Sequence, residues 1–269
     1  TMANLKEIRN RISSVSSTMQ ITSAMKMVSA AKLKKAQDAI TAMRPYSNKL
    51  TEILQSLSSS IDSDNKYAQK RDVKKVLIVS ITSNRGLCGG FNSNIFKKST
   101  ELANSIYNDS DVSFVAIGKK GNDFLQKSFN VESNHIDIFD NLNMENVSLI
   151  AESLMEMFTN EDFDKIDIVY NKFKNAATQV VVSEQFLPIS DVEDNSNNNS
   201  DYIFEPSKKE IIEELIPKSL KNQLFKAIRD SWASEHGARM TAMHKATDNA
   251  TELRDQLKLA YNQARQAAI

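Results

Sequence analysis

Apolar residues recur with a heptad spacing along the first segment of the chain. They stand three and four residues apart at Leu5, Ile8, Ile12, Val15 and Met19. Residues with this spacing form one stripe along a helix, and such a stripe needs a second helix to pack against. The stripe goes on less regularly through Met25, Val28, Ala36, Ile40, Met43, Leu50, Ile53, Leu54 and Leu57. We expect a kink or break at Pro45, because proline lacks the amide hydrogen that a helix uses.

The last segment of the chain has the same spacing. Its stripe consists of Met243, Ala246, Ala250, Leu253, Leu257, Ala260, Ala264 and Ala267, and Leu220, Leu224 and Ile228 precede it. Many of these side chains are small, so the backbone of a partner helix can come close. Pro217 predicts a break or a first turn, and Gly237 is a weak point because glycine has a low helix propensity.

Two helices of this length do not fit inside one globule. A helix of roughly 50 residues is about 75 Å long, whereas a compact domain of this chain's size has a radius of gyration of about 18 Å. The helices therefore project, and the simplest arrangement pairs them with each other. The alternative is a bundle of shorter helices separated by loops.

Strand-like and helix-like runs alternate through the middle of the chain, which places the fold in the α/β class. We expect strands at 75–82, 112–118, 135–139, 165–173 and 179–189, and helices at 92–107, 119–129 and 144–158. This order predicts a mostly parallel, Rossmann-like sheet flanked by helices. The predicted parts are an N-terminal helix at 1–60, an α/β domain at 74–205 and a C-terminal helix at 207–269. The acidic, asparagine-rich tract 191–201 is typical of a mobile surface loop.

Charge is distributed unevenly although the net charge is zero. Residues 1–60 carry 9 basic and 3 acidic side chains, residues 61–206 carry 14 and 23, and residues 207–269 carry 11 and 8. Basic ends suggest an acidic partner. The sequence contains no apolar run of membrane-spanning length, and its N-terminus resembles neither a signal region nor a transit peptide.

The stretch SNRGLCGGFN, residues 83–92, is the strongest candidate for chemistry and is called the glycine loop below. It follows the first predicted strand and contains Gly86, Gly89 and Gly90. A dinucleotide site needs G-x-G-x-x-G with an acidic residue about 20 positions later, and a P-loop needs G-x-x-x-x-G-K-[ST]. The loop matches neither pattern, so we expect a tight structural turn, whose free amides could hold an incidental anion.

Other catalytic or metal-binding patterns are weak. Cys88 has no histidine near it in sequence, which favours a buried thiol over a nucleophile. His135, His236 and His244 have no metal-ligand spacing. No Ser-His-Asp or paired-carboxylate arrangement stands out. We therefore expect no catalytic residue, no cofactor and no metal site.

Several stretches together resemble one protein family. They are ITSAMKMVSAAKLKKAQ (21–37), RPYS (44–47), the glycine loop, YNKF (170–173), ASEHGARMTAMHKATDNA (233–250) and LAYNQARQAAI (259–269). In this order they resemble the gamma subunit of the rotary F-type ATP synthase, and the likeness runs from about Asn4 to the end of the chain. Independent motifs in the right order are more specific than any one of them.

The resemblance implies a fold and a function. In this family the terminal helices form an antiparallel coiled coil inside a ring of alternating alpha and beta subunits. The α/β domain lies at the base, near an epsilon-type subunit and the membrane c-ring. The subunit is the rotor shaft of a proton- or sodium-translocating synthase. It has no catalytic residue, small-molecule substrate or nucleic-acid partner of its own.

The resemblance also implies contact residues. Met25 and Lys26 would face a lever loop of the beta subunit, and Arg239, Arg265 and Gln266 would touch ring loops higher on the shaft. The helix pattern alone makes each of them a solvated or coiled-coil residue. The family signature comprises Arg85, Gly86, Leu87, Cys88, Gly89 and Gly90.

The side chain of Arg85 leaves two roles open. It could anchor the α/β domain to the coiled coil or face a neighbouring subunit. In the family the C-terminal helix continues beyond the last motif, so we expect further residues after Ile269. The cysteine insertion of chloroplast versions is absent, and with the lack of a transit peptide this favours a bacterial subunit on the cytoplasmic face of the inner membrane.

Two other functions fit parts of the sequence. A nucleotide-dependent enzyme with a coiled-coil arm would bind a nucleotide saturably. A basic coiled coil could also bind nucleic acid, but Tyr46 is the only aromatic residue in 1–60, which leaves little for base stacking.

Overall fold

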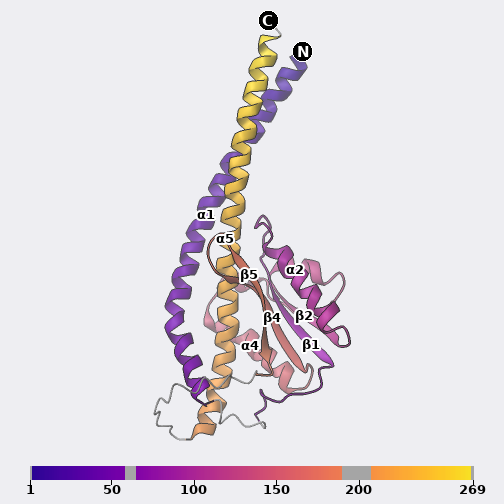
Figure 1. Cartoon of the computed structure of the whole chain (residues 1–269), viewed down its shortest axis with the longest axis vertical. Coiled ribbons are helices and arrows are strands. Elements are labelled where there is room, and N and C mark those ends of the chain that lie inside the picture. Colours follow the sequence, from indigo (N-terminus) through magenta and orange to yellow (C-terminus); the bar gives the residue numbers. More distant parts are fainter. Residues whose placement is uncertain (1, 58–64, 190–206, 268–269) are drawn as a thin grey trace.

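Two long helices lie side by side and carry an α/β unit against their lower half (Figure 1). The computed structural model describes residues 2–57, 65–189 and 207–267. Helices α1 (Met2–Leu57) and α5 (Lys208–Gln266) have 56 and 59 residues, and are about 84 and 88 Å long at 1.5 Å per residue. Both chain ends lie at the same tip of the shaft, so the two helices are antiparallel.

The predicted stripe of α1 faces α5, with one change of register. From Leu5 to Met19 the predicted positions are the half-buried ones, and lower down Leu33, Ala36 and Ile40 are buried. The prediction was wrong at Val28, whose side chain is 57% exposed, because the buried positions there are the polar Thr22 and Ser29. Their hydroxyl groups donate to the carbonyls of Met19 and Met25 in the preceding turn.

The stripe of α5 departs from the prediction in the upper shaft. Met243 and Ala250 are buried as expected, but Leu253 is 47% exposed. Arg254 is half-buried beside it, and its guanidinium lies 3.4 Å from the sulfur of Met19. An aliphatic stem can cover apolar surface while its charged end stays near water, which is how arginine substitutes for leucine here.

Neither proline interrupts its helix, so the breaks expected at Pro45 and Pro217 do not occur. Next to Pro45, the buried side chain of Ser47 and that of Asn222 on α5 exchange hydrogen bonds of 3.1 Å. Packing against α5 thus supports the turn that lacks one backbone hydrogen bond. The helix α5 likewise continues through Gly237.

The sheet has the strand order β3-β2-β1-β4-β5, in which only β5 runs antiparallel to its neighbour. Its strands are β1 (Lys75–Ile81), β2 (Asp111–Ile117), β3 (Asn130–Asn134), β4 (Lys165–Phe173) and β5 (Gln179–Leu187). The strand expected at 135–139 was wrong. The edge strand is the preceding polar segment, and Asp137–Phe139 forms a short 3₁₀ turn, η3, that buries Ile138.

Helices cover both faces of the sheet, and α5 is one of them. One face packs α2 (Phe91–Glu101), its π-helical continuation η2 (Leu102–Ile106) and α3 (Lys119–Leu125). The other packs α4 (Met144–Thr159) and the lower part of α5, where Leu224 and Ile228 join the same apolar cluster as Leu77 and Val79. The shaft is therefore built into the core of the α/β unit.

The acidic tract 191–201 lies outside the described residues. Within the described ranges, no helix combines the length and apolar character needed to cross a bilayer.

Candidate functional site

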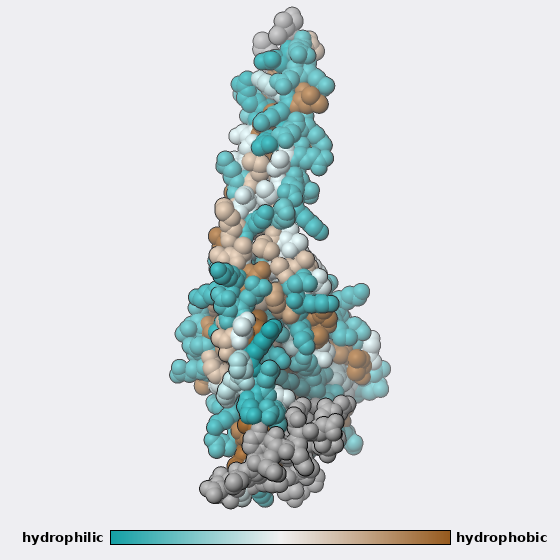
Figure 2. Space-filling view, turned by 60° about the vertical axis from the view of Figure 1, so that its left-hand side comes forward, coloured by the Kyte–Doolittle hydropathy of each residue, from teal (hydrophilic) through white to brown (hydrophobic). Residues whose placement is uncertain are grey.

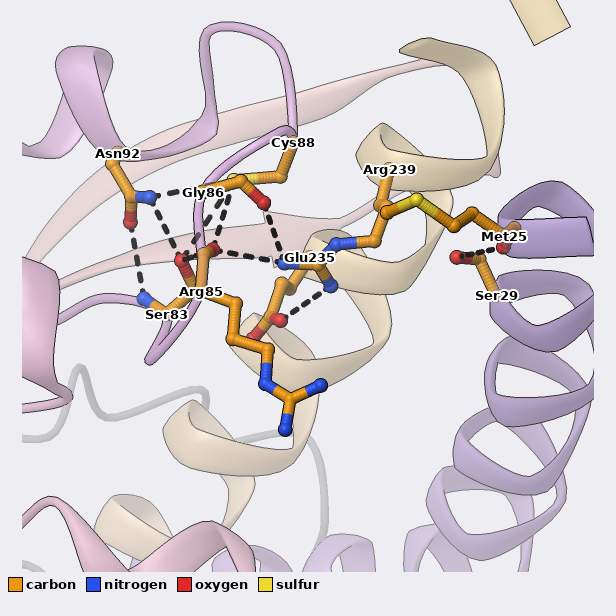
Figure 3. Close-up of polar contacts among 9 residues, drawn as sticks. All are labelled: Met25, Ser29, Ser83, Arg85, Gly86, Cys88, Asn92, Glu235 and Arg239. Carbon is orange, nitrogen blue, oxygen red and sulfur yellow. Dashed lines mark hydrogen bonds and ion pairs between the residues drawn. The ribbon is translucent and has the colours of Figure 1, made fainter. Parts of the chain in front are cut away.

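The glycine loop joins β1 to α2 and is closed by its own polar side chains. The Asn92 side chain accepts from the Ser83 amide at 3.0 Å and donates to the Ser83 hydroxyl at 2.7 Å. That hydroxyl donates in turn to the carbonyl of Arg85 at 2.7 Å (Figure 3). Leu87 and Gly89 have φ angles of 61° and 58°, which complete the tight turn. Only glycine adopts such angles without strain.

Cys88 is the buried thiol that the sequence predicted. It is 2% exposed, and the side-chain amide of Asn92 donates to its sulfur at 3.3 Å. Burial raises the pKa of the thiol. A neutral, enclosed thiol is a poor nucleophile, so its place in the structure is that of a small packing residue.

The carboxyl ends of β1 and β2, where Rossmann-like sheets hold nucleotides, are filled by the chain itself. A Cβ atom on Gly118, which has a φ angle of 108°, would overlap the carbonyl oxygen of Thr82. The Thr82 hydroxyl also accepts from the Gly121 amide at 2.8 Å. The described residues likewise contain no cluster of three His, Cys, Asp or Glu side chains suited to a metal ion.

Arg239 of α5 ties the glycine loop to the shaft. Its Nη2 donates to the carbonyls of Arg85 at 2.9 Å and Gly86 at 3.3 Å, while its Nη1 lies 2.6 Å from the Glu235 carboxylate. Both Arg239 and Glu235 are buried. Burial raises the pKa of Glu235, and the adjacent Arg239 opposes that shift. A paired, hydrogen-bonded arrangement is what makes two buried charges tolerable.

The backbone and the side chain of Arg85 have different roles. Its carbonyl receives the hydrogen bond from Arg239, whereas its side chain is exposed and extends away from the loop (Figure 3). The backbone of the loop is thus the anchor to the coiled coil, and the guanidinium stays available to solvent. Leu87 is also exposed at the loop tip.

The five predicted contact residues do not form one surface. Met25 is half-buried and its side chain points from α1 toward the buried Arg239 (Figure 3). The ammonium group of Lys26 lies 3.4 Å from Nδ1 of His244 on α5. Arg265 and Gln266 are exposed in the last turn of α5, near the far tip of the shaft. On the face that Figure 2 shows, hydrophilic side chains cover most of the upper shaft.

Sequence reasoning missed the buried polar residues of lower α5. Asp230, Ser234, Glu235 and His236 are all buried although their spacing and chemistry suggest a solvated face. Neither ring nitrogen of His236 has a hydrogen-bond partner among the described residues, and its ring meets Trp232 edge-on at 5.1 Å. The sequence did contain one sign of this burial: the four polar residues stand in a stretch whose apolar spacing is that of a packed helix.

Comparison with known proteins agrees with this architecture. A family described as ATP synthase matches residues 4–269. The ATP synthase gamma chain of Christiangramia forsetii is 63% identical over 270 residues, which covers 100% of this chain and 94% of that protein. The chain belongs to the ATP synthase gamma-chain family. The gamma chain of Flavobacterium johnsoniae is 66% identical over 273 residues, with the same coverage, and supports a bacterial member.

Solved structures extend the likeness of this gamma-chain family member to the fold. The central stalk and c-ring structure of Tetrahymena thermophila mitochondrial ATP synthase contains a chain that is 28% identical, with a TM-score of 0.66, covering 84% of this chain and 99% of that one. A rotor chain of Euglena gracilis mitochondrial ATP synthase is 20% identical, with a TM-score of 0.70 and coverage of 100% and 99%. The fold of paired terminal helices with an inserted α/β unit is thus confirmed.

Proposed function

We propose that this chain is the central rotor shaft of a bacterial ATP synthase, which passes torque between a membrane c-ring and a catalytic ring of alpha and beta subunits. The observation that carries the proposal is the pair of helices of 56 and 59 residues, coupled along their length and built into an α/β unit at one end. Two coupled helices resist bending and twisting better than one, as a shaft must.

The subunit itself performs no ATP chemistry in this proposal. Support comes from the glycine loop, whose polar groups are occupied internally, and from the filled ends of β1 and β2. The shaft acts through its asymmetry: as it turns, it makes the three catalytic beta sites inequivalent, which is a coupling of conformational states. The α/β unit would lie at the base with an epsilon-type subunit, against the cytoplasmic face of the bacterial inner membrane.

Arg265 and Gln266 are the residues that we propose to touch the ring near the tip. Their exposure at the end of α5 supports this role. Met25 and Lys26 are proposed to meet a beta lever loop at mid-shaft, where both are half-buried. Exposed charge pairs are worth about 0–1 kcal/mol each, so the shaft can move past successive partners. For Arg239 the buried guanidinium favours a role inside this chain over a contact with the ring.

Reconstitution with alpha and beta subunits tests the proposal. The chain is expected to co-purify with the ring and to change its ATPase activity. An Arg265→Ala/Gln266→Ala variant should still assemble but show a several-fold change in ring ATPase, because it lacks side chains at the tip. Asn262→Ala, an exposed polar residue of α5 one turn away, is the matched control. A chain that forms no complex with the ring would disprove the function.

A further inference from the structure

Two turns of α5 contact the carboxyl ends of β1 and β4, where they hold the glycine loop and the turn between β4 and β5. The buried Ser234 hydroxyl donates to the carbonyl of Asn171 at the end of β4, at 2.9 Å. The Thr241 hydroxyl donates to the carbonyl of Ala176 in the β4–β5 turn, at 3.3 Å. Arg239, between them, holds the glycine loop. We call this stretch of α5, from Ser234 to Thr241, the junction.

The fit at the junction is close. A Cβ atom on Gly237 would lie 2.9 Å from the Ala176 carbonyl oxygen, nearer than side chains normally approach. The glycine loop is also joined to the end of β4, since the Asn171 side chain donates to the carbonyl of Phe91 at 3.2 Å. The glycine loop, the end of β4, the β4–β5 turn and α5 are therefore held together. Arg239 is the sole side chain of the described α5 residues that hydrogen-bonds to the glycine loop.

The helix α1 completes this meeting point. Its Leu33, Ala36 and Ile40 pack in one buried cluster with Ala233 of α5, and Phe173 and Ala176 of the β4–β5 hairpin pack against that cluster. Both helices of the shaft and the α/β unit thus meet at the same level. Torque between the shaft and the α/β unit must therefore pass through this meeting point or through the apolar core below it.

We propose that Arg239 is a positioning residue that fixes the glycine loop of the α/β unit to the shaft, above the apolar core that the two share, so that they turn as one body. The proposal rests on the rotor function proposed above. The planar guanidinium suits the task because its fork reaches the Glu235 carboxylate and two loop carbonyls at once. Without it, the carbonyls of Arg85 and Gly86 and the buried carboxylate of Glu235 lose their donor, and the loop can separate from α5.

The test compares coupling in the assembled, membrane-bound complex that carries an Arg239→Gln shaft. ATP hydrolysis should continue, while the number of protons or sodium ions pumped per ATP hydrolysed falls, because the shaft holds the α/β unit less firmly. In the full chain, amide exchange at Ser83 and Phe91 should speed up about ten-fold, since a buried charged donor is lost. Lys245→Gln, an exposed residue on α5, removes the same charge outside the junction and should leave both measurements unchanged.

A reversible cross-link separates this role from a contact with the ring. A Cβ atom on Gly89 would lie 4.0 Å from Cβ of Ala242, within the range of about 3.5–4.5 Å that suits a disulfide. In a Cys88→Ala background, Gly89→Cys with Ala242→Cys should restore the pumping ratio of the Arg239→Gln complex when oxidised and lose it again on reduction. The same background with Arg239 retained is the control for the two cysteines and for the backbone strain that a side chain causes at the φ angle of 58° of Gly89.

Three outcomes are decisive. Normal pumping by Arg239→Gln overturns the inference, and so does a defect that the oxidised cross-link fails to repair, since Arg239 would then act on an outside partner. Loss of pumping that the cross-link repairs supports the inference. If the unmodified chain neither assembles nor supports pumping, the rotor function itself fails, which is a separate result.

Discussion

Two buried titratable residues of α5 have pKa values shifted in opposite senses. Burial lowers the pKa of His236 to about 3, and the nearby charges of Arg239 and Lys32 act in the same direction. Burial raises the pKa of Asp230 to about 6, although Lys226 and Lys172 oppose the shift. The folded state therefore keeps His236 neutral and holds a proton on Asp230 over an overlapping range of pH.

The His236→Leu variant should reveal the contribution of this histidine. The unfolded chain takes up a proton near the ordinary pKa of 6.5 and the folded chain only near 3. The stability from His236 is thus present above pH 6.5 and is lost as the pH falls. A single such group contributes about 1.4 kcal/mol per pH unit. Urea unfolding of the variant between about pH 4 and pH 6 should lack that fall.

Asp230→Asn is the control of opposite sign. Between its ordinary pKa of 3.8 and the raised value of about 6, only the folded state binds the proton, so Asp230 stabilises the fold more as the pH falls. The Asp230→Asn variant should therefore lose stability more steeply than the parent chain as the pH falls. The His236→Leu variant should instead gain stability over the same range, because only the contribution of Asp230 remains. Equal pH profiles for both variants and the parent chain would contradict these assignments.

At the scale of residues, the sequence predicts less than at larger scales. It identifies Cys88 as a buried thiol, because the lack of a histidine near it in sequence is enough for that inference. It does not reveal that Arg239 and Glu235 are buried, because a charged residue on a long helix is normally solvated. Besides Glu235, the partners of the buried Arg239 lie about 150 residues earlier in the chain, in the glycine loop.

At the scale of elements, small side chains let α1 and α5 approach each other. Ala36 and Ala233 are fully buried in one cluster between the two helices. An Ala36→Leu substitution should lower the unfolding free energy by about 1–3 kcal/mol, because the packed interface has no room for the added atoms. Chemical denaturation with a matched Ala31→Leu control, whose site is exposed on the same helix, measures the difference. A tolerated leucine at position 36 would contradict the close packing.

The hydrophobic periodicity and residue composition predict helices and strands well where one face of the element is consistently apolar. The strand 165–173 and the helix beginning at Met144 agree with the structure. The error at 135–139 arose because His-Ile-Asp-Ile-Phe alternates like a strand, while the true edge strand, Asn130–Asn134, is polar and only half-buried. An edge strand is fixed by backbone pairing with β2, which a hydrophobic pattern does not record.

At the scale of the whole molecule, burial decreases toward the tip of the shaft. No described residue from 5 to 19 or from 251 to 267 is buried, whereas the junction and the core below it contain many fully buried side chains. Local opening should follow this gradient. Hydrogen exchange of the isolated chain is expected to be fastest in the upper shaft, and slowest in β1, β4 and lower α5.

Addition of the alpha and beta subunits supplies the comparison for that experiment. If the ring surrounds the shaft, the upper amides should become protected while those of the sheet core change little. Uniform exchange along both helices of the isolated chain would contradict the burial gradient. The length of the helical segments and their heptad spacing indicated two long paired helices. They did not indicate the decrease of burial toward the tip, because small and polar residues give similar patterns in weakly and strongly packed regions.

The antiparallel pairing of α1 and α5 has a consequence for biosynthesis. The hydroxyl of Tyr261 accepts from Arg9, a contact between residues 252 positions apart. After α1 ends at Leu57, the ribosome must add roughly 150 residues before α5 begins at Lys208, which takes about 8–30 s at 5–20 residues per second. During this time the apolar stripe of α1 has no partner helix, and the face of the sheet that α5 covers is also open. The nascent chain must therefore keep both apolar surfaces from aggregating until α5 is made.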